Sequence, residues 1–216
     1  MLDSFVKPYI DKPIATAGQN LVEKRITSTQ VTIGGFAIGL LAAFAAGMQA
    51  YGIGLILMLI NRLSDELDDA VADASTRTPF GTYIDVITNM VFYGAVVLMF
   101  GMGQGQNLGA AFVLFCFMTM TSTYYASVIL GSNQNTPTTA GKLTFSPGSL
   151  IEGTETTIYL ILIFLFPSAF AALSMIFGFL CLVTAGGRIY ATMQDLKETP
   201  AKKPAENSEA SEEDSV

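Results

Sequence analysis

Acidic residues crowd into one short stretch of the chain, DELDDAVAD at positions 65–73. The stretch follows a long apolar run, and ionisable groups at the edge of a membrane segment are costly and usually functional. On a helix, Asp65, Asp68 and Ala72 share one face, because they are spaced i, i+3, i+7. Glu66 and Asp73 point elsewhere, and for these two residues alone a solvated cap is the favoured interpretation. The spaced pair is therefore the first candidate for chemistry.

A further acidic residue follows after a short loop, predicted at 74–80. Asp85 and Asn89 are spaced i, i+4 and so lie on one helix face. Two antiparallel helices joined by this loop would bring Asp65 and Asp68 opposite Asp85. Three converging carboxylates repel one another unless a cation is present, and a divalent metal that clamps a phosphate would explain them. The chain contains no histidine, so we expect a hard cation held by carboxylates.

The elements that position these residues follow from the distribution of charge. Of the 216 residues, 51% are hydrophobic and 13% are charged, which is about half the charge of a typical soluble domain. No charged residue lies within 26–61, 86–141 or 156–187. A membrane helix needs roughly 20 residues, so each gap has room for a helical hairpin. The sequence predicts an all-α, polytopic membrane protein with six transmembrane helices, at about 31–48, 52–73, 81–101, 108–131, 149–167 and 169–191.

The hairpin tips lack charge, and every lysine and arginine falls on the other side. The positive-inside rule therefore predicts that both termini and the acidic cluster face the cytoplasm, in a bacterial inner membrane. The glycine-rich tip at 101–109 is interpreted as a turn rather than a phosphate loop. An ion channel or transporter is disfavoured, because the apolar segments carry no charge deep enough to mark an ion path.

The flanking segments are polar. Residues 1–30 are expected to form a cytoplasmic amphipathic segment, with an interfacial helix at 13–25 that starts at Pro13; a solvated leader is the alternative. The membrane domain spans 31–192, and 193–216 is expected to be a disordered acidic tail. Other expected features are Lys142 in the cytoplasmic loop 132–148, either a phosphate contact or a solvated lysine, and Gly35 and Gly39, a possible close-packing face.

The acidic stretches together resemble a known signature. The CDP-alcohol phosphatidyltransferase family carries D-x2-D-G-x2-A-R followed by G-x3-D-x3-D. The matching positions here are Asp65, Asp68, Asp69, Ala72 and Asp73, followed by Gly81, Asp85 and Asn89. The stretches ITSTQVTIGGFAIG (26–39), NRLSDELDDAVADAS (61–75) and EGTET (152–156) are also similar to segments of a bacterial branch of the family. The resemblance covers about residues 5–192.

The resemblance implies both a reaction and a set of ligands. Members of the family transfer a phosphoalcohol group from a CDP-alcohol, such as CDP-diacylglycerol, to an acceptor alcohol and release CMP in phospholipid biosynthesis. It implies Mg²⁺ or Mn²⁺ held by Asp65, Asp68 and Asp85, with Thr32 and Gly81 at the donor site. It also implies a homodimer surrounded by membrane lipids, and we expect no nucleic-acid partner.

Three positions depart from the signature. Asp69 replaces the glycine, Asp73 replaces the arginine, and Asn89 replaces the fourth aspartate, which is the general base of the family. Loss of a general base typically costs about 10²–10⁴-fold in rate. Either Asp69 or Asp73 takes over as base or binds an extra cation, or the protein is a pseudoenzyme that binds lipid, metal or a partner protein. Arg62 and Arg77 flank the cluster and are expected to neutralise part of it or to contact lipid phosphates.

Overall fold

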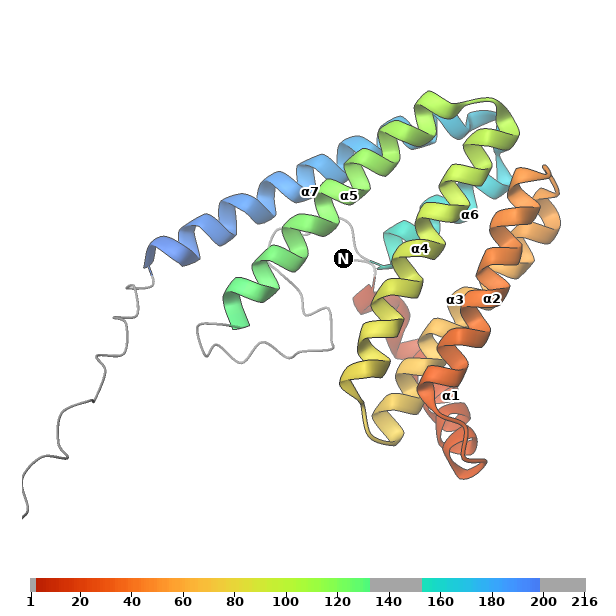
Figure 1. Cartoon of the computed structure of the whole chain (residues 1–216), viewed down its shortest axis with the longest axis vertical. Coiled ribbons are helices and arrows are strands. Elements are labelled where there is room, and N and C mark those ends of the chain that lie inside the picture. The colour runs from red at the N-terminus through yellow and green to blue at the C-terminus, as the bar shows by residue number, and fades with distance from the viewer. Residues whose placement is uncertain (1–2, 133–152, 199–216) are drawn as a thin grey trace, which may run out of the picture.

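A computed structural model describes residues 3–132 and 153–198 (Figure 1). The regular structure within these ranges is entirely helical, which confirms the all-α prediction. The elements are α1 (Asp3–Glu23), α2 (Ser28–Gly47), α3 (Tyr51–Ala74), α4 (Pro79–Gln104), α5 (Asn107–Ser132), α6 (Gly153–Leu165), the 3₁₀ turn Pro167–Ala169, and α7 (Phe170–Glu198). Helices α2 to α7 correspond in order to the six predicted segments. Most of the predicted loop, with Lys142, and the end of the predicted tail lie outside the described residues.

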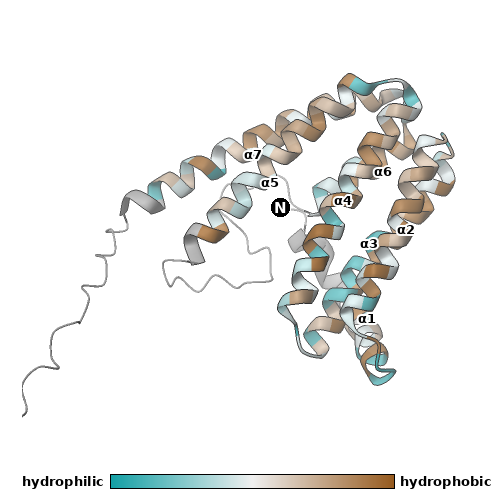
Figure 2. Ribbon diagram, viewed as in Figure 1, coloured by the Kyte–Doolittle hydropathy of each residue, from teal (hydrophilic) through white to brown (hydrophobic). Residues whose placement is uncertain are grey.

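Several of these helices have the length and composition of membrane spans. Four described segments qualify, namely α2, α4, α5 to Ile129, and Pro167–Gln194. Helix α3 carries its acidic residues in its C-terminal half, and the described part of α6 has 13 residues. Hydrophilic residues gather where α1, α3 and α4 meet, while hydrophobic residues follow the helices away from that end (Figure 2). The chain is a polytopic membrane protein.

Two helices that position the site begin earlier than predicted, because of local capping. At the start of α2, the Thr27 side chain accepts from the Gln30 backbone N–H and the Gln30 side chain accepts from the Thr27 N–H. This capping box starts the helix at 28 rather than 31. At the start of α4, the Thr78 hydroxyl accepts from the Gly81 N–H and proline occupies the first turn, so the helix begins at 79 rather than 81.

The N-terminal helix also differs from its prediction. Helix α1 begins at Asp3 and passes through Pro13, so the expectation that Pro13 starts the helix is wrong. A proline inside a helix removes one backbone hydrogen bond. The local sequence pattern does not show whether the remaining contacts of the helix compensate for that loss. Gly18 of α1 is buried against α3, where a Cβ would lie 2.9 Å from the Ala70 Cβ. The segment is therefore a packed part of the fold rather than a solvated leader.

Helix α2 packs closely on both α3 and α4, and small residues allow it to do so. A Cβ added at Gly35 would lie 2.7 Å from the Ser64 Cβ of α3. One added at Gly39 would lie 2.6 Å from the Phe92 Cδ2 of α4. The predicted close-packing face is thus used within the chain. Figure 1 shows α5 and α7 side by side, leaning away from the bundle of α2, α3 and α4.

Aromatic residues fill the core where the two groups of helices join. The Phe100 ring of α4 stacks on Phe170 at 5.0 Å and meets the edge of Phe164 at 5.5 Å. Cys116 and Cys181 are free and fully buried in this core. The interpretation of both cysteines as small hydrophobic residues is confirmed.

We expect the Gly39→Leu variant to be destabilised, because the new side chain overlaps Phe92 and overpacking costs about 1–3 kcal/mol. Thermal unfolding of detergent-purified protein measures the effect as a lower Tm. The matched control is Gly34→Leu, at an exposed glycine with no atom within 4 Å of an added Cβ. Equal melting temperatures for the two variants would contradict the packing described.

Candidate metal centre

The three spaced aspartates converge as the helical periodicity predicts. Asp65 and Asp68 project from α3, and Asp85 projects from the second turn of α4. One carboxylate oxygen from each lies within 4.8 Å of the others. Asp68 is buried, while Asp65 and Asp85 are partly exposed. The loop between the helices is only four residues long, so it holds the two helix ends together.

Helix α2 contributes a polar contact to this cluster. The Thr32 hydroxyl lies 2.6 Å from Oδ2 of Asp68 and 2.9 Å from the Ser28 carbonyl oxygen one turn earlier. Both Thr32 and Asp68 are buried. The hydroxyl can donate to either oxygen, and donation to Asp68 stabilises its charged form. Thr32, which the resemblance assigned to the donor site, therefore contacts one of the metal candidates directly.

Asn89 is a central part of the cluster. Its amide nitrogen donates to Oδ1 of Asp65 at 2.6 Å and to Oδ1 of Asp85 at 2.8 Å. Ionised carboxylates only accept hydrogen bonds, so the amide nitrogen must face them. An aspartate at this position would present a third negative charge to the same two groups unless a proton or a cation intervened. Asn89 thus links α3 to α4 and offsets the repulsion between their carboxylates.

Arg62 is held beneath the cluster by several contacts. Its guanidinium donates to Oδ1 of Asn89 at 2.8 Å and reaches Oδ2 of Asp65 at 3.4 Å. It also lies over the rings of Phe92 and Tyr93, at 4.5 and 4.7 Å from their centroids. These contacts confirm that Arg62 neutralises part of the cluster. The stacking was not predicted, because it depends on where α4 lies relative to α3.

The two additional aspartates share a second arginine. Arg77, in the loop between α3 and α4, donates from Nη2 to Oδ1 of Asp69 at 2.7 Å and to Oδ1 of Asp73 at 3.1 Å. The side chain of Arg77 is 25% exposed, and each carboxylate is 54% exposed. Burial lowers the pKa of Arg77, but the two aspartates outweigh that effect and the net shift is upward. The prediction that Arg77 neutralises part of the cluster is confirmed.

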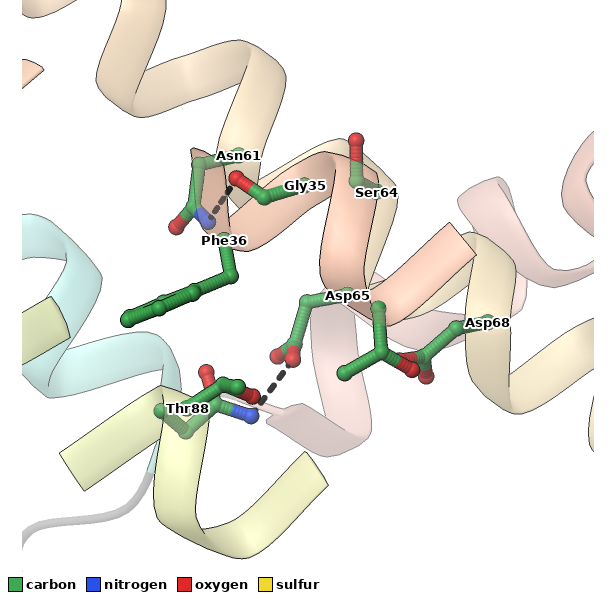
Figure 3. Close-up of a pocket in the computed structure, with 9 residues that line it drawn as sticks. Gly35, Phe36, Asn61, Ser64, Asp65, Asp68 and Thr88 are labelled. Atoms are coloured by element: carbon green, nitrogen blue, oxygen red, sulfur yellow. Dashed lines mark hydrogen bonds between the residues drawn. The ribbon is translucent and has the colours of Figure 1, made fainter. Parts of the chain in front are cut away.

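Two adjacent pockets open onto the carboxylates. The first contains Asp65, Asp68 and Asn89, and Figure 3 shows it between α2, α3 and α4. Asn61, Ser64 and Thr88 also line it, and none of them was predicted. Asn61 is buried and donates to the Gly35 carbonyl oxygen at 2.8 Å. Asn61 lies one helical turn before Asp65, and this spacing is the sequence signal that could have identified it as a site residue.

The second pocket lies on the other side of Asp68, toward the start of α4. Asp68, Asp69, Asp85 and Arg77 line it, together with Gly81. A Cβ at Gly81 would lie 3.1 Å from the Thr78 Oγ1 and 3.4 Å from the Thr29 Oγ1. The glycine therefore permits close approach of α4 to the start of α2. Asp73 does not line either of these two pockets.

The donor set fits a divalent cation. Carboxylate oxygens are the ligands that Mg²⁺ and Mn²⁺ prefer. The three aspartates provide such oxygens from two helices, close enough together to coordinate one ion. The hydroxyl of Thr32 and the amide of Asn89 orient two of the three ligands. The cluster can thus bind a metal ion and present it to either pocket.

The chain is similar in sequence to two known proteins. It is 34% identical over 202 residues to the inner membrane protein YnjF of Escherichia coli K12, which covers 91% of this chain and 98% of that protein. It is 28% identical over 125 residues to the archaetidylinositol phosphate synthase of Pyrococcus horikoshii, which covers 57% of this chain and 64% of that one. No family model and no solved structure matches. The similarity along nearly the full length of YnjF, together with the converging aspartates, shows that the chain belongs to the CDP-alcohol phosphatidyltransferase family.

Proposed function

We propose that this protein transfers a phosphoalcohol group from a CDP-alcohol, such as CDP-diacylglycerol, to an acceptor alcohol and releases CMP. The observation that carries the proposal is the convergence of Asp65, Asp68 and Asp85 within 4.8 Å. A CDP-alcohol carries its negative charge on a diphosphate, which an acidic pocket repels unless a cation is bound. Three carboxylates whose oxygens lie within 4.8 Å of one another fit such a substrate, because together they would bind the cation that the diphosphate needs.

Asp65, Asp68 and Asp85 are the proposed ligands of Mg²⁺ or Mn²⁺. A divalent ion held there would neutralise the diphosphate and favour departure of CMP. Thr32 and Asn89 hold the ligands in place through their hydrogen bonds. Gly81 leaves the second pocket room beside the start of α4.

We propose that the reacting acceptor is deprotonated by Asp69. An amide cannot accept a proton at neutral pH, so Asn89 is unsuited to the task. Asp69 lines the second pocket with Asp68 and Asp85, whereas Asp73 does not. The name of the Pyrococcus horikoshii relative indicates a phosphorylated inositol product for that protein. A phosphorylated polyol is therefore the first acceptor to test here.

The proposed membrane arrangement has six transmembrane helices, α2 to α7, with α1 at the cytoplasmic interface. Apolar side chains are exposed along the first half of α3, among them Ile53, Ile56 and Leu59, which supports a place in the bilayer for this helix too. Arg62 and Arg77 lie beside the aspartates, and the positive-inside rule then places the site and both termini at the cytoplasmic face. A similar protein belongs to the inner membrane of Escherichia coli. A homodimer surrounded by membrane lipid completes the proposal.

A catalytically impaired protein is the second candidate. Other side chains of the protein donate hydrogen bonds to all five aspartates of this region, Asp65, Asp68, Asp69, Asp73 and Asp85. Asn89 serves two of them, Thr32 one and Arg77 the remaining two. This network gives each aspartate a hydrogen-bond partner without a metal, which is compatible with a member of the family that binds lipid or a partner protein.

We expect purified protein in lipid, given Mg²⁺ or Mn²⁺, CDP-diacylglycerol and a panel of alcohols that includes inositol phosphate, to release CMP. Asp65→Ala should lower the rate by at least about 100-fold, because metal stabilisation of transition-state charge is worth several kcal/mol. Chelation with EDTA should have the same effect. Glu66→Ala, on the exposed face of the same turn, is the matched control and should retain the rate.

The outcomes separate the two candidate functions. CMP release that survives both EDTA and Asp65→Ala would overturn the metal assignment. No CMP release with any acceptor, together with activity in an Asp69→Gly, Asp73→Arg, Asn89→Asp triple variant, would favour the impaired protein.

We expect Asn89→Asp to lower the Tm without metal, because two hydrogen bonds to carboxylates are replaced by repulsion. Added Mg²⁺ should then raise the Tm more in this variant than in the wild type, since binding stabilises the folded state by RT ln(1 + [L]/Kd). Asn107→Asp makes the same change at the exposed start of α5. Its metal response should match the wild type, and an equal response in all three proteins would refute a metal at the cluster.

A further inference from the structure

Among the described residues that line the second pocket, Arg77 is the one with a cationic side chain. The charged residues around it there are Asp68, Asp69 and Asp85. An arginine in an acidic pocket is normally expected to pair with the nearest carboxylates. Here Arg77 forms ion pairs with the outer aspartates, Asp69 and Asp73. The inner aspartates, Asp65, Asp68 and Asp85, each place one carboxylate oxygen within 4.8 Å of the others.

The ion pairs between these outer aspartates and Arg77 are weak. Both carboxylates are about half exposed, so water and salt screen their attraction to the guanidinium. Both of these hydrogen bonds are donated by the same nitrogen, Nη2. A ligand with more charge and a bidentate geometry can compete for such an arginine. Phosphate has both properties, and guanidinium binds it with two parallel hydrogen bonds.

The position of Arg77 suits a diphosphate that reaches the metal candidates. The residue belongs to the four-residue loop that joins the ends of α3 and α4, directly before the Thr78 cap. The pocket that it lines reaches Asp68 and Asp85 on one side and Gly81 on the other. An anionic group that enters this pocket from the loop therefore meets Arg77 as well as the metal candidates.

We propose that Arg77 is the phosphate-binding cation of the donor pocket, and that Asp69 and Asp73 hold its guanidinium at the mouth until a diphosphate displaces them. The inference rests on the proposed function and assigns it a specific residue. It gives the two additional aspartates a role: they keep Arg77 away from the metal ligands in the absence of substrate. Displacement of Asp69 by the diphosphate would also release that carboxylate to accept a proton.

Calorimetric titration of the full-length protein in detergent with Mg²⁺ tests the proposal, with CDP, CMP and cytidine as probes. Arg77→Gln should weaken CDP binding by about 10- to 100-fold, the loss expected for a hydrogen-bonded charge pair. Arg77→Lys should bind CDP with intermediate affinity, since lysine keeps the positive charge but cannot form the two parallel hydrogen bonds of a guanidinium. Arg25→Gln, an exposed arginine that lines neither pocket, is the matched control and should bind as the wild type does.

The three probes distinguish phosphate binding from a structural role. Arg77→Gln should affect CDP more than CMP and leave cytidine binding unchanged. Equal weakening for all three ligands, or a CDP affinity equal to that of Arg25→Gln, overturns the role of Arg77 while the metal-dependent CMP release remains a separate measurement. A wild-type protein that binds no CDP with Mg²⁺ overturns the donor pocket, and with it both the proposed function and the inference.

Discussion

Repulsion among carboxylates at the joined ends of α3 and α4 is the constraint around which the rest of this structure is arranged. Two charges about 5 Å apart repel by roughly 3 kcal/mol at an effective dielectric constant of 20. A hydrogen bond to a charged group returns about 1.5–3 kcal/mol. The two effects are of similar size, so each aspartate needs its own partner. The Thr32 hydroxyl, the Asn89 amide and the guanidinium groups of Arg62 and Arg77 supply them.

These partners come from elements that meet only because the helices pack closely. Thr32 reaches Asp68 because Gly35 and Gly39 let α2 lie against α3 and α4. Arg62 reaches Asn89 because the Phe92 and Tyr93 rings support its guanidinium. The packing of the bundle and the chemistry of the site are therefore coupled. A change that separates α2 from its neighbours also removes a partner from a buried carboxylate.

The departures from the family signature form a connected set in the structure. Asp69 and Asp73 bind the same arginine, Arg77, which lies eight and four positions farther along the chain, respectively. Asn89 bridges two carboxylates in the position where the family has another acid. Each change appears as a simple loss when the motif is compared position by position. Together they produce a region in which neighbouring side chains donate hydrogen bonds to every aspartate, and two arginines offset part of the negative charge.

The sequence by itself determined the helical class, the order of the six apolar segments and the convergence of Asp65, Asp68 and Asp85. The lengths of the uncharged stretches are enough to predict the apolar helices. The i, i+3 spacing of Asp65 and Asp68, together with a short loop before the next helix, leaves few ways to place the three carboxylates. Tertiary structure decided which side chains balance those charges. The contacts of Thr32 with Asp68 and of Arg62 with Asn89 join residues 36 and 27 positions apart. Such contacts depend on the relative positions of whole helices. Close packing at glycines sets those positions, and a local sequence pattern does not reveal them.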